Sequence, residues 1–122
     1  MIMSETGKQY DLEERTEKFA RSVRVFCKKL KVTIINADDI RQVIRSSGSV
    51  GANYIEANES LSPKDFIHRI KICRKEAKET RYWFNILDLT QEELNSEKEK
   101  LLQEAGELTK IFAAILRKSG AQ

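Results

Sequence analysis

Residues 45–87 read RSSGSVGANYIEANESLSPKDFIHRIKICRKEAKETRYWFNIL, and this stretch decides the fold. Its first part is dense in Ser, Gly and Ala, and its second part begins at the pair Ser62-Pro63. Ser is a favoured N-cap residue and Pro is favoured at the first helical position, so the pair predicts the start of a helix. That helix is expected to run over 63–89, which is about 40 Å at 1.5 Å per residue.

The predicted helix 63–89 carries three rows of side chains at helical spacing. The first row is an unbroken apolar repeat made of Phe66, Ile70, Cys73, Ala77, Thr80, Phe84 and Leu87. The second row is mixed and consists of Ile72, Glu76, Glu79, Trp83 and Ile86. The third, called the basic row, consists of Lys64, His68, Lys71, Lys75, Lys78 and Tyr82, with Arg74 and Arg81 on its flanks. Two rows with apolar residues predict that this helix contacts more than one neighbour, within the chain or in another subunit.

The small residues before Ser62 predict a second helix with a closely packed surface. This helix is expected to start near 36–38 and to end near Ser60. Gly48 and Gly51 lie inside it, and each costs about 1 kcal/mol relative to Ala. We expect the close approach of a neighbouring helix over the Ser, Gly and Ala surface to offset that cost.

Two further helices are predicted at the ends of the chain. The first is expected from an N-cap at Asp11 to about Leu30, because its apolar residues share one face. Residues 31–35 are expected to form a loop. The last helix has two candidate capping boxes, Thr90 with Glu93 and Ser96 with Glu99; a turn over 90–95 is favoured, with the helix ending near Lys118. Its expected core residues are Leu101, Ala105, Leu108, Phe112 and Ile115.

Four amphipathic helices joined by short loops predict an all-α fold, an antiparallel up-down-up-down four-helix bundle. At 122 residues the chain is expected to form one domain, with frayed ends at 1–9 and 119–122.

Charge and cysteine content point to the same class of protein. The net charge is only +3, but residues 63–89 hold seven basic and four acidic side chains. Cys27 and Cys73 both lie in apolar helical patterns, which is typical of buried thiols in a reducing compartment. The first ten residues are polar, and the longest apolar run, 111–116, is far below the roughly 20 residues of a membrane span. A soluble cytoplasmic protein is therefore expected.

The run from Arg45 to Ala57 resembles the signature of a bacterial family of four-helix bundle proteins, which are encoded by intervening sequences within 23S ribosomal RNA genes. The resemblance spans about residues 11–118. The further matching positions are Asp11 to Thr16, Phe19, Ser62, Lys64 to Ile67, Lys75 to Ala77, Glu79 to Trp83, Glu104, Glu107, Leu108, Ile111 and Phe112. The sequence departs from the family at Gly48, where Thr is usual, and at Ile55, where Arg is frequent.

The resemblance implies a ring-like homopentamer. It also implies a bundle shared with the accessory protein of diversity-generating retroelements, which binds nucleic acid and a reverse transcriptase. The resemblance does not supply a molecular activity, and no cofactor is expected.

Polar residues on the two central helices predict an internal network. Its expected members are Ser49, Asn53, Glu56, Glu76 and Glu79, with an arginine such as Arg45, Arg74 or Arg81 as partner. Buried carboxylates need such partners. An exposed subunit contact is the alternative. Carboxylate-bridged metal sites in helix bundles normally use two motifs in which a His follows a Glu by three residues. This chain has a single His, so no metal site is expected.

The basic row is the strongest functional lead. His68 has no evident nucleophile partner, and Gly48 and Gly51 lie within a helical pattern, so neither catalysis nor a phosphate loop is predicted. The candidate nucleic-acid-binding residues are Lys64, His68, Lys71, Arg74, Lys75, Lys78 and Arg81. One hypothesis is a non-enzymatic oligomer that binds RNA or DNA through them as a scaffold or accessory factor. The alternative is a solvated lysine face on a purely structural or protein-binding oligomer.

Overall fold

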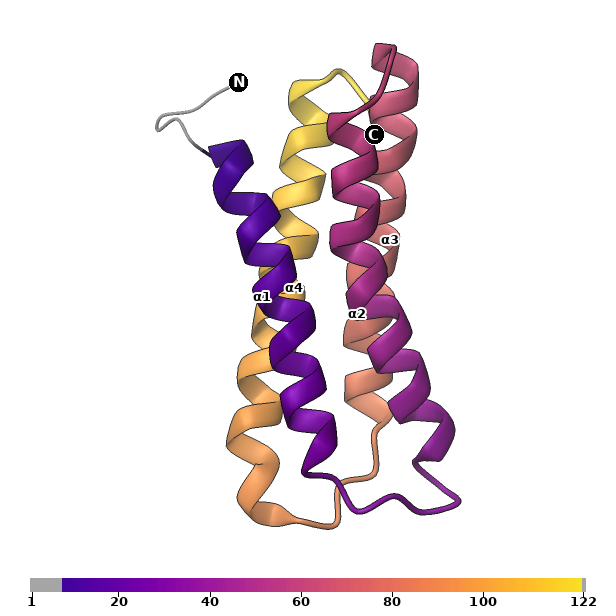
Figure 1. Ribbon diagram of the computed structural model, residues 1–122, viewed down its shortest axis with the longest axis vertical. Helices are drawn as coiled ribbons and strands as arrows, with labels where there is room; N and C mark the ends of the chain where they lie inside the picture. Colours follow the sequence, from indigo (N-terminus) through magenta and orange to yellow (C-terminus); the bar gives the residue numbers. More distant parts are fainter. Residues whose placement is uncertain (1–7, 122) are drawn as a thin grey trace.

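The computed structural model describes the backbone of residues 8–121 and the side chains of residues 12–121. Within that range the chain is helical and has no strand. The elements are α1 (Lys8–Lys28), α2 (Ala37–Asn58), α3 (Pro63–Ile86), the short 3-10 helix η1 (Glu92–Leu94) and α4 (Asn95–Lys118). The four long helices lie side by side and alternate in direction (Figure 1), so the predicted all-α up-down-up-down bundle is confirmed.

The helix α3 packs against both α2 and α4, whereas α1 packs against α2 and, less extensively, α4. The pairs α1–α3 and α2–α4 are therefore diagonal. This arrangement explains much of the double row on α3 without a second subunit. The first row faces the core, where Ile70, Cys73 and Phe84 are fully buried, and Glu76 of the second row is buried beside α2.

The start of α3 is as predicted. The Ser62 hydroxyl accepts a hydrogen bond from the Asp65 backbone N–H at 3.1 Å, and Pro63 is the first helical residue. The Asp65 carboxylate in the first turn suits the positive end of the helix dipole. The helix ends at Ile86, a little before the expected residue 89.

Two amide side chains close the end of the bundle where α1 joins α2. Asn36, which is buried, accepts from the Thr33 N–H at 2.7 Å and donates to the carbonyls of Lys31 and Asp88. The Gln91 side chain accepts from the Lys31 N–H and donates to the Lys29 carbonyl. Several backbone groups of the loop over 31–35 are therefore hydrogen-bonded without a strand, and the segment is a loop, as expected.

Gly51 marks the predicted close helix approach. A methyl group at this position would lie 2.9 Å from Thr16 Oγ1 and 3.2 Å from Thr16 Cβ, both on α1. Gly48 faces the Arg24 guanidinium, 3.1 Å from the position of such a methyl. The expected packing surface is therefore confirmed, and α1 is the neighbour that makes it.

Three details of the helix ends differ from the sequence predictions. Helix α1 already begins at Lys8, so Asp11 lies inside it and is not its N-cap. Neither predicted capping box starts α4, because η1 precedes it and Leu94 occupies the N-cap position with no side-chain cap. In the core stripe of α4, Leu116 is fully buried, whereas Ile115 is only half-buried.

The end of α4 forms a glycine-terminated cap where fraying was expected. Gly120 has a φ of +79°, the left-handed conformation that glycine adopts at little cost. The Ala121 N–H donates to the Leu116 carbonyl at 2.8 Å and the Gly120 N–H to the Arg117 carbonyl at 3.1 Å, which is the Schellman pattern. Residues 1–7 and 122, also expected to fray, lie outside the described residues.

The core runs the length of the bundle and is built mainly of aliphatic and aromatic side chains. Phe26 of α1 packs edge-on against Phe84 of α3 with ring centroids 6.0 Å apart, and Tyr54 of α2 packs against Phe112 of α4 at 6.0 Å. Among the described residues, no helix is long and apolar enough to cross a membrane.

Candidate nucleic-acid interface

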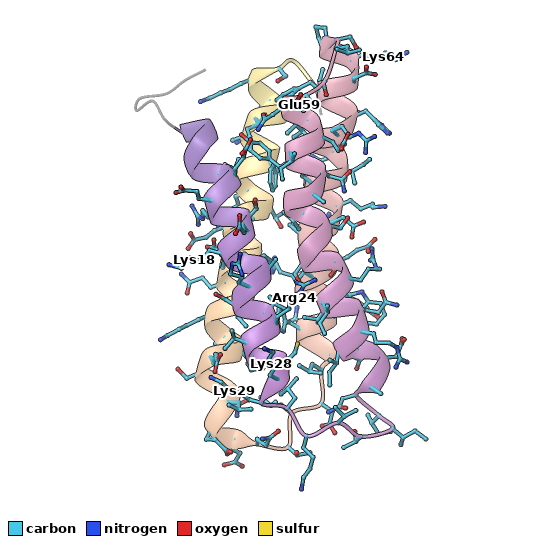
Figure 2. All side chains as sticks on the ribbon, in the orientation of Figure 1. Lys18, Arg24, Lys28, Lys29, Glu59 and Lys64 are labelled. Atoms are coloured by element: carbon cyan, nitrogen blue, oxygen red, sulfur yellow. The ribbon has the colours of Figure 1, made fainter. Side chains whose placement is uncertain are left out.

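The basic row of α3 faces solvent along the whole helix. Its exposed members are Lys64, His68, Lys71, Lys75, Lys78 and Tyr82, and the flanking Arg81 is also exposed. Arg74 on the other flank is half-buried. Figure 2 shows Lys64 at the start of α3, projecting from the end of the bundle opposite the α1–α2 loop.

The cations of this row are almost free of ion pairs. Among the described side chains, its single ion pair joins Lys75 Nζ to Glu76 Oε2 at 3.9 Å. The basic side chains of α1 are mixed in this respect: Lys18 and Lys28, labelled in Figure 2, have no ion pair among the described side chains, whereas Arg15 and Arg21 are paired. Arg21 pairs with Glu17 at 2.8 Å, and Lys29, the residue that follows α1, pairs with Glu97 at 3.0 Å. An unpaired cation keeps its full attraction for an external anion, and α3 places several such cations in one continuous row, so this row is the better candidate.

A shallow, open groove of about 640 Å³ lies beside the basic row. Its lining residues are Gln42, Lys71, Arg74, Lys75, Lys78, Glu79, Tyr82 and Trp83. The groove therefore combines four cations with two aromatic rings. Gln42 of α2 also lines it, although the sequence pattern did not single this residue out.

Next to the groove, Arg45 of α2 bridges two carboxylates of α3. Its Nη2 atom lies 3.0 Å from Glu79 Oε1 and 3.3 Å from Glu76 Oε1. Glu79 is half-exposed, but Glu76 is only 6% exposed, and its Oε1 atom makes no hydrogen bond within the described residues. The contact to Glu76 is thus an ion pair without hydrogen-bond geometry.

Thr80 takes part in the same contact between α2 and α3. Its hydroxyl lies 2.7 Å from the Ser46 hydroxyl and donates to the Glu76 carbonyl at 2.8 Å. The sequence pattern placed Thr80 in the apolar row because its methyl group fits there. The signal in the sequence for this contact was that Thr80 is a small polar residue at the same level of the bundle as Ser46.

Ser49 and Asn53 form a separate cluster nearer the other end of α2. The Asn53 amide donates to the Ser49 hydroxyl at 3.0 Å, and its carbonyl oxygen accepts from Arg69 at 3.1 Å. Arg69 was missed as a partner, and no spacing signal distinguished it from the other arginines of α3. Glu56, expected in the network, is exposed instead, because it lies on the solvent side of α2.

The other arginines expected in the network lie elsewhere. Arg81 extends over α4, where its Cδ and Nε atoms would each lie 3.6 Å from a methyl group placed at Gly106. Arg74 lines the groove. The single network predicted from the sequence is thus two clusters, one around Arg45 and one around Asn53.

Two of the titratable groups in the core are thiols. Burial raises the pKa of the Cys73 thiol to about 12 and that of Cys27 to about 11, so both stay protonated at neutral pH. The reactive form of cysteine is a thiolate with a low pKa, and the thiols of Cys27 and Cys73 do not have this form. Within the described part of the chain, no three His, Cys, Asp or Glu side chains gather in a way that could hold a metal ion.

Comparisons with known proteins were made for the sequence and for the fold. The family model for the 23S rRNA-intervening sequence protein matches residues 8–114. A similar solved structure is that of a protein of unknown function from the S23 ribosomal protein family of Bacteroides thetaiotaomicron, with 30% sequence identity and a TM-score of 0.70. The alignment covers 84% of this chain and 95% of that one. A comparison with curated proteins gave no match. Because the family model spans most of the sequence and its bundle is the one observed, the chain belongs to the 23S rRNA-intervening sequence protein family.

Proposed function

We propose that this protein is a non-enzymatic, self-associating bundle that binds RNA or DNA through the basic row of α3, as a scaffold or accessory factor. The observation that carries the proposal is a line of solvent-facing cations with almost no internal ion pairs. From Lys64 to Arg81 the line extends about 25 Å along the helix axis. A line of this length can follow the closely spaced charges of a nucleic-acid backbone.

Binding of this kind is driven by counterion release and selects weakly for sequence. The test is a filter-binding titration with a structured RNA over a salt series. We expect affinity to fall steeply as salt rises, and the double variant Lys71→Glu with Lys75→Glu to abolish binding. Absence of wild-type binding at about 50 mM salt would contradict the proposal.

A matched charge reversal on another helix separates a local site from a general charge effect. Lys18 and Lys28 of α1 are exposed, and they lie on the α1 face labelled in Figure 2. The double variant Lys18→Glu with Lys28→Glu changes the net charge by the same amount as the α3 variant. It is expected to retain binding, with only a modest loss from the altered net charge.

Self-association, as a pentameric ring by family resemblance, is part of the same proposal. It is supported by apolar side chains exposed at the end of the bundle that holds the α1–α2 loop and the end of α3 (Figure 1). Ile34 is 95% exposed and Ile35 68% exposed, and Val32 and Ile86 are exposed with them. Such a group of apolar side chains is typical of a protein contact. A ring would repeat the basic row on every subunit and form a continuous positive band.

The alternative function is a purely structural or protein-binding oligomer. It is favoured by a second groove of about 710 Å³ at the α2–α3 turn, lined in part by Leu61, Phe66 and Ile67. Leu61 is 96% exposed there. Under this alternative the α3 charge reversal leaves function intact, whereas Leu61→Glu impairs it. The salt-series titration therefore discriminates between the two functions.

A further inference from the structure

We infer that the groove beside the basic row accepts unpaired bases of a single-stranded nucleic acid, with Tyr82 as the stacking surface. This inference rests on the proposed function and specifies its substrate class. It concerns whether the bound nucleic acid is single-stranded or double-stranded. The row of cations alone does not decide this, because it attracts the phosphates of single strands and duplexes alike.

Tyr82 occupies an unusual place for an aromatic side chain. It is 55% exposed and continues the basic row one helical turn beyond Lys78. Its ring meets the Trp83 ring edge-to-face, with centroids 5.2 Å apart and an interplanar angle of 75°. Trp83 is half-buried and packs against the core, so it gives the exposed ring a fixed support.

An exposed ring among cations suits unpaired bases better than a duplex. In a duplex the bases already stack on one another, and a protein that reads only its backbone gains nothing from an aromatic ring. In a single strand each base offers a free π-face, and stacking on an aromatic side chain is tolerant of sequence. The combination of a basic groove with an aromatic platform is therefore matched to a single strand.

The dimensions of the groove agree with this ligand. Its volume of about 640 Å³ leaves room for a base and part of its backbone. Lys71, Lys75 and Lys78 lie between about 6 and 16 Å from Tyr82 along the helix axis. With a base on Tyr82, phosphates of neighbouring nucleotides would lie within reach of these ammonium groups.

The one carboxylate that lines the groove is partly compensated. Glu79 accepts a hydrogen bond from Arg45 Nη2 at 3.0 Å, so this α2 cation, which it shares with Glu76, offsets part of its charge. Arg45 Nε also donates to the Gln42 side-chain oxygen at 3.2 Å, which orients that amide at the groove wall. The amide nitrogen of Gln42 is thereby available to donate to a base edge.

Three labelled probes of equal length test the inference by fluorescence anisotropy at low salt. They are an oligo(dT) strand of about 12 nucleotides, an abasic strand with the same number of phosphates, and a DNA duplex of about 12 base pairs. The wild type is expected to bind oligo(dT) more tightly than the abasic strand. Tyr82→Ala should weaken binding to oligo(dT) about 5- to 150-fold and leave binding to the abasic strand unchanged.

Three controls accompany this variant. Tyr82→Phe keeps the ring and should retain binding. Ile55→Ala removes a side chain of similar exposure (53%) from α2 and should have no effect. Trp83 is the only Trp in the chain, so its fluorescence should change with oligo(dT) and not with the abasic strand.

The outcomes separate the inference from the proposed function. If Tyr82→Ala binds oligo(dT) as the wild type does, or if the abasic strand binds equally well, the stacking inference is overturned. The proposed function would survive that result provided that Lys71→Glu with Lys75→Glu still abolished binding to every probe. If the wild type binds none of the probes at low salt, the proposed function itself fails and the inference fails with it.

Discussion

Gly51 and Gly106 both lie inside helices, but only Gly51 is pressed against a neighbouring helix. A methyl group at Gly51 would approach Thr16 to 2.9 Å, whereas one at Gly106 would meet only the Arg81 side chain at 3.6 Å, an ordinary contact. We expect Gly51→Ala to lower the free energy of unfolding by about 1–3 kcal/mol through overpacking. Gly106→Ala should raise it by up to about 1 kcal/mol, the difference in helix propensity. Urea denaturation of both variants checks this, and changes of the same sign would contradict it.

Arg45 is the partner that makes the buried Glu76 carboxylate tolerable. Removing it leaves Glu76 with only Lys75 nearby, at 3.9 Å. Because Arg45 is itself half-exposed, we expect Arg45→Ala to cost about 2–3 kcal/mol, less than the full penalty for breaking a buried pair. Chemical denaturation at neutral pH measures the change.

Two variants provide controls for this ion pair. Glu79→Ala removes the exposed half of the contact and should cost about 0.5 kcal/mol. The double variant Arg45→Met with Glu76→Met replaces the pair by apolar side chains and should recover most of the stability lost in Arg45→Ala. If Arg45→Ala and Glu79→Ala cost the same, water must solvate Glu76 and the argument from burial fails.

At the scale of elements, α1 packs less extensively against α4 than against α2, and one arginine joins α1 to α4. Arg15 Nε lies 2.7 Å from Glu104 Oε2, and Arg15 Nη2 lies 2.8 Å from Glu107 Oε1. The geometry with Glu104 is bidentate, which is the stronger form of such a pair. We expect Arg15→Ala to cost about 1 kcal/mol at neutral pH, measured by urea denaturation.

The same ion pairs predict a pH dependence. Hydrogen bonds from Gln103 and Arg15 lower the pKa of Glu107 below its ordinary value of 4.5. A lowered carboxyl pKa contributes stability that is present above the unfolded-state value and is lost as pH falls through the folded-state value. The stability difference between wild type and Arg15→Ala should therefore shrink below about pH 4. A constant difference down to pH 2 would show that Arg15 acts through packing alone.

The sequence predicted the helices well where strong local signals agreed with tertiary packing. Ser62 and Pro63 set the start of α3, and the close approach at Gly51 followed from the cost of glycine in a helix. The expected turn over 90–95 agrees with a start of α4 at Asn95, but the predicted capping boxes were wrong, because a cap is worth only about 1 kcal/mol and burial of Leu94 outweighs it.

The polar contacts between α2 and α3 were harder to predict. Helical periodicity indicates the face on which a residue lies, but it does not indicate which residue of the facing helix it contacts. The pattern offered three arginines as partners for Glu76 and Glu79, and the structure selects one of them, Arg45. It placed Glu56 in the network although the side chain points to solvent, and it missed Arg69, whose partner is set by the relative shift of α2 along α3. Such shifts depend on side-chain packing between helices, which one sequence does not encode locally.

At the scale of the whole molecule, the basic row and the exposed isoleucines of the α1–α2 loop occupy different parts of the surface. Free cations line the outer side of α3, while exposed isoleucines gather at the end that holds the α1–α2 loop. A contact through that end would leave the basic row accessible to solvent. The two parts of the proposed function therefore do not compete for the same surface.

Self-association through this end is the last prediction. We expect light scattering at micromolar concentration to give a mass several times the 14.1 kDa of one chain. Ile34→Lys with Ile35→Lys should shift the protein towards the monomer, because each subunit would then bury charge at the contact. Ile55→Lys, a charge added at an exposed isoleucine of α2, is the control and should leave the mass unchanged. A monomeric wild type would contradict self-association. If the wild type is oligomeric and the loop variant has the same mass, the subunits must contact one another through another face of the bundle.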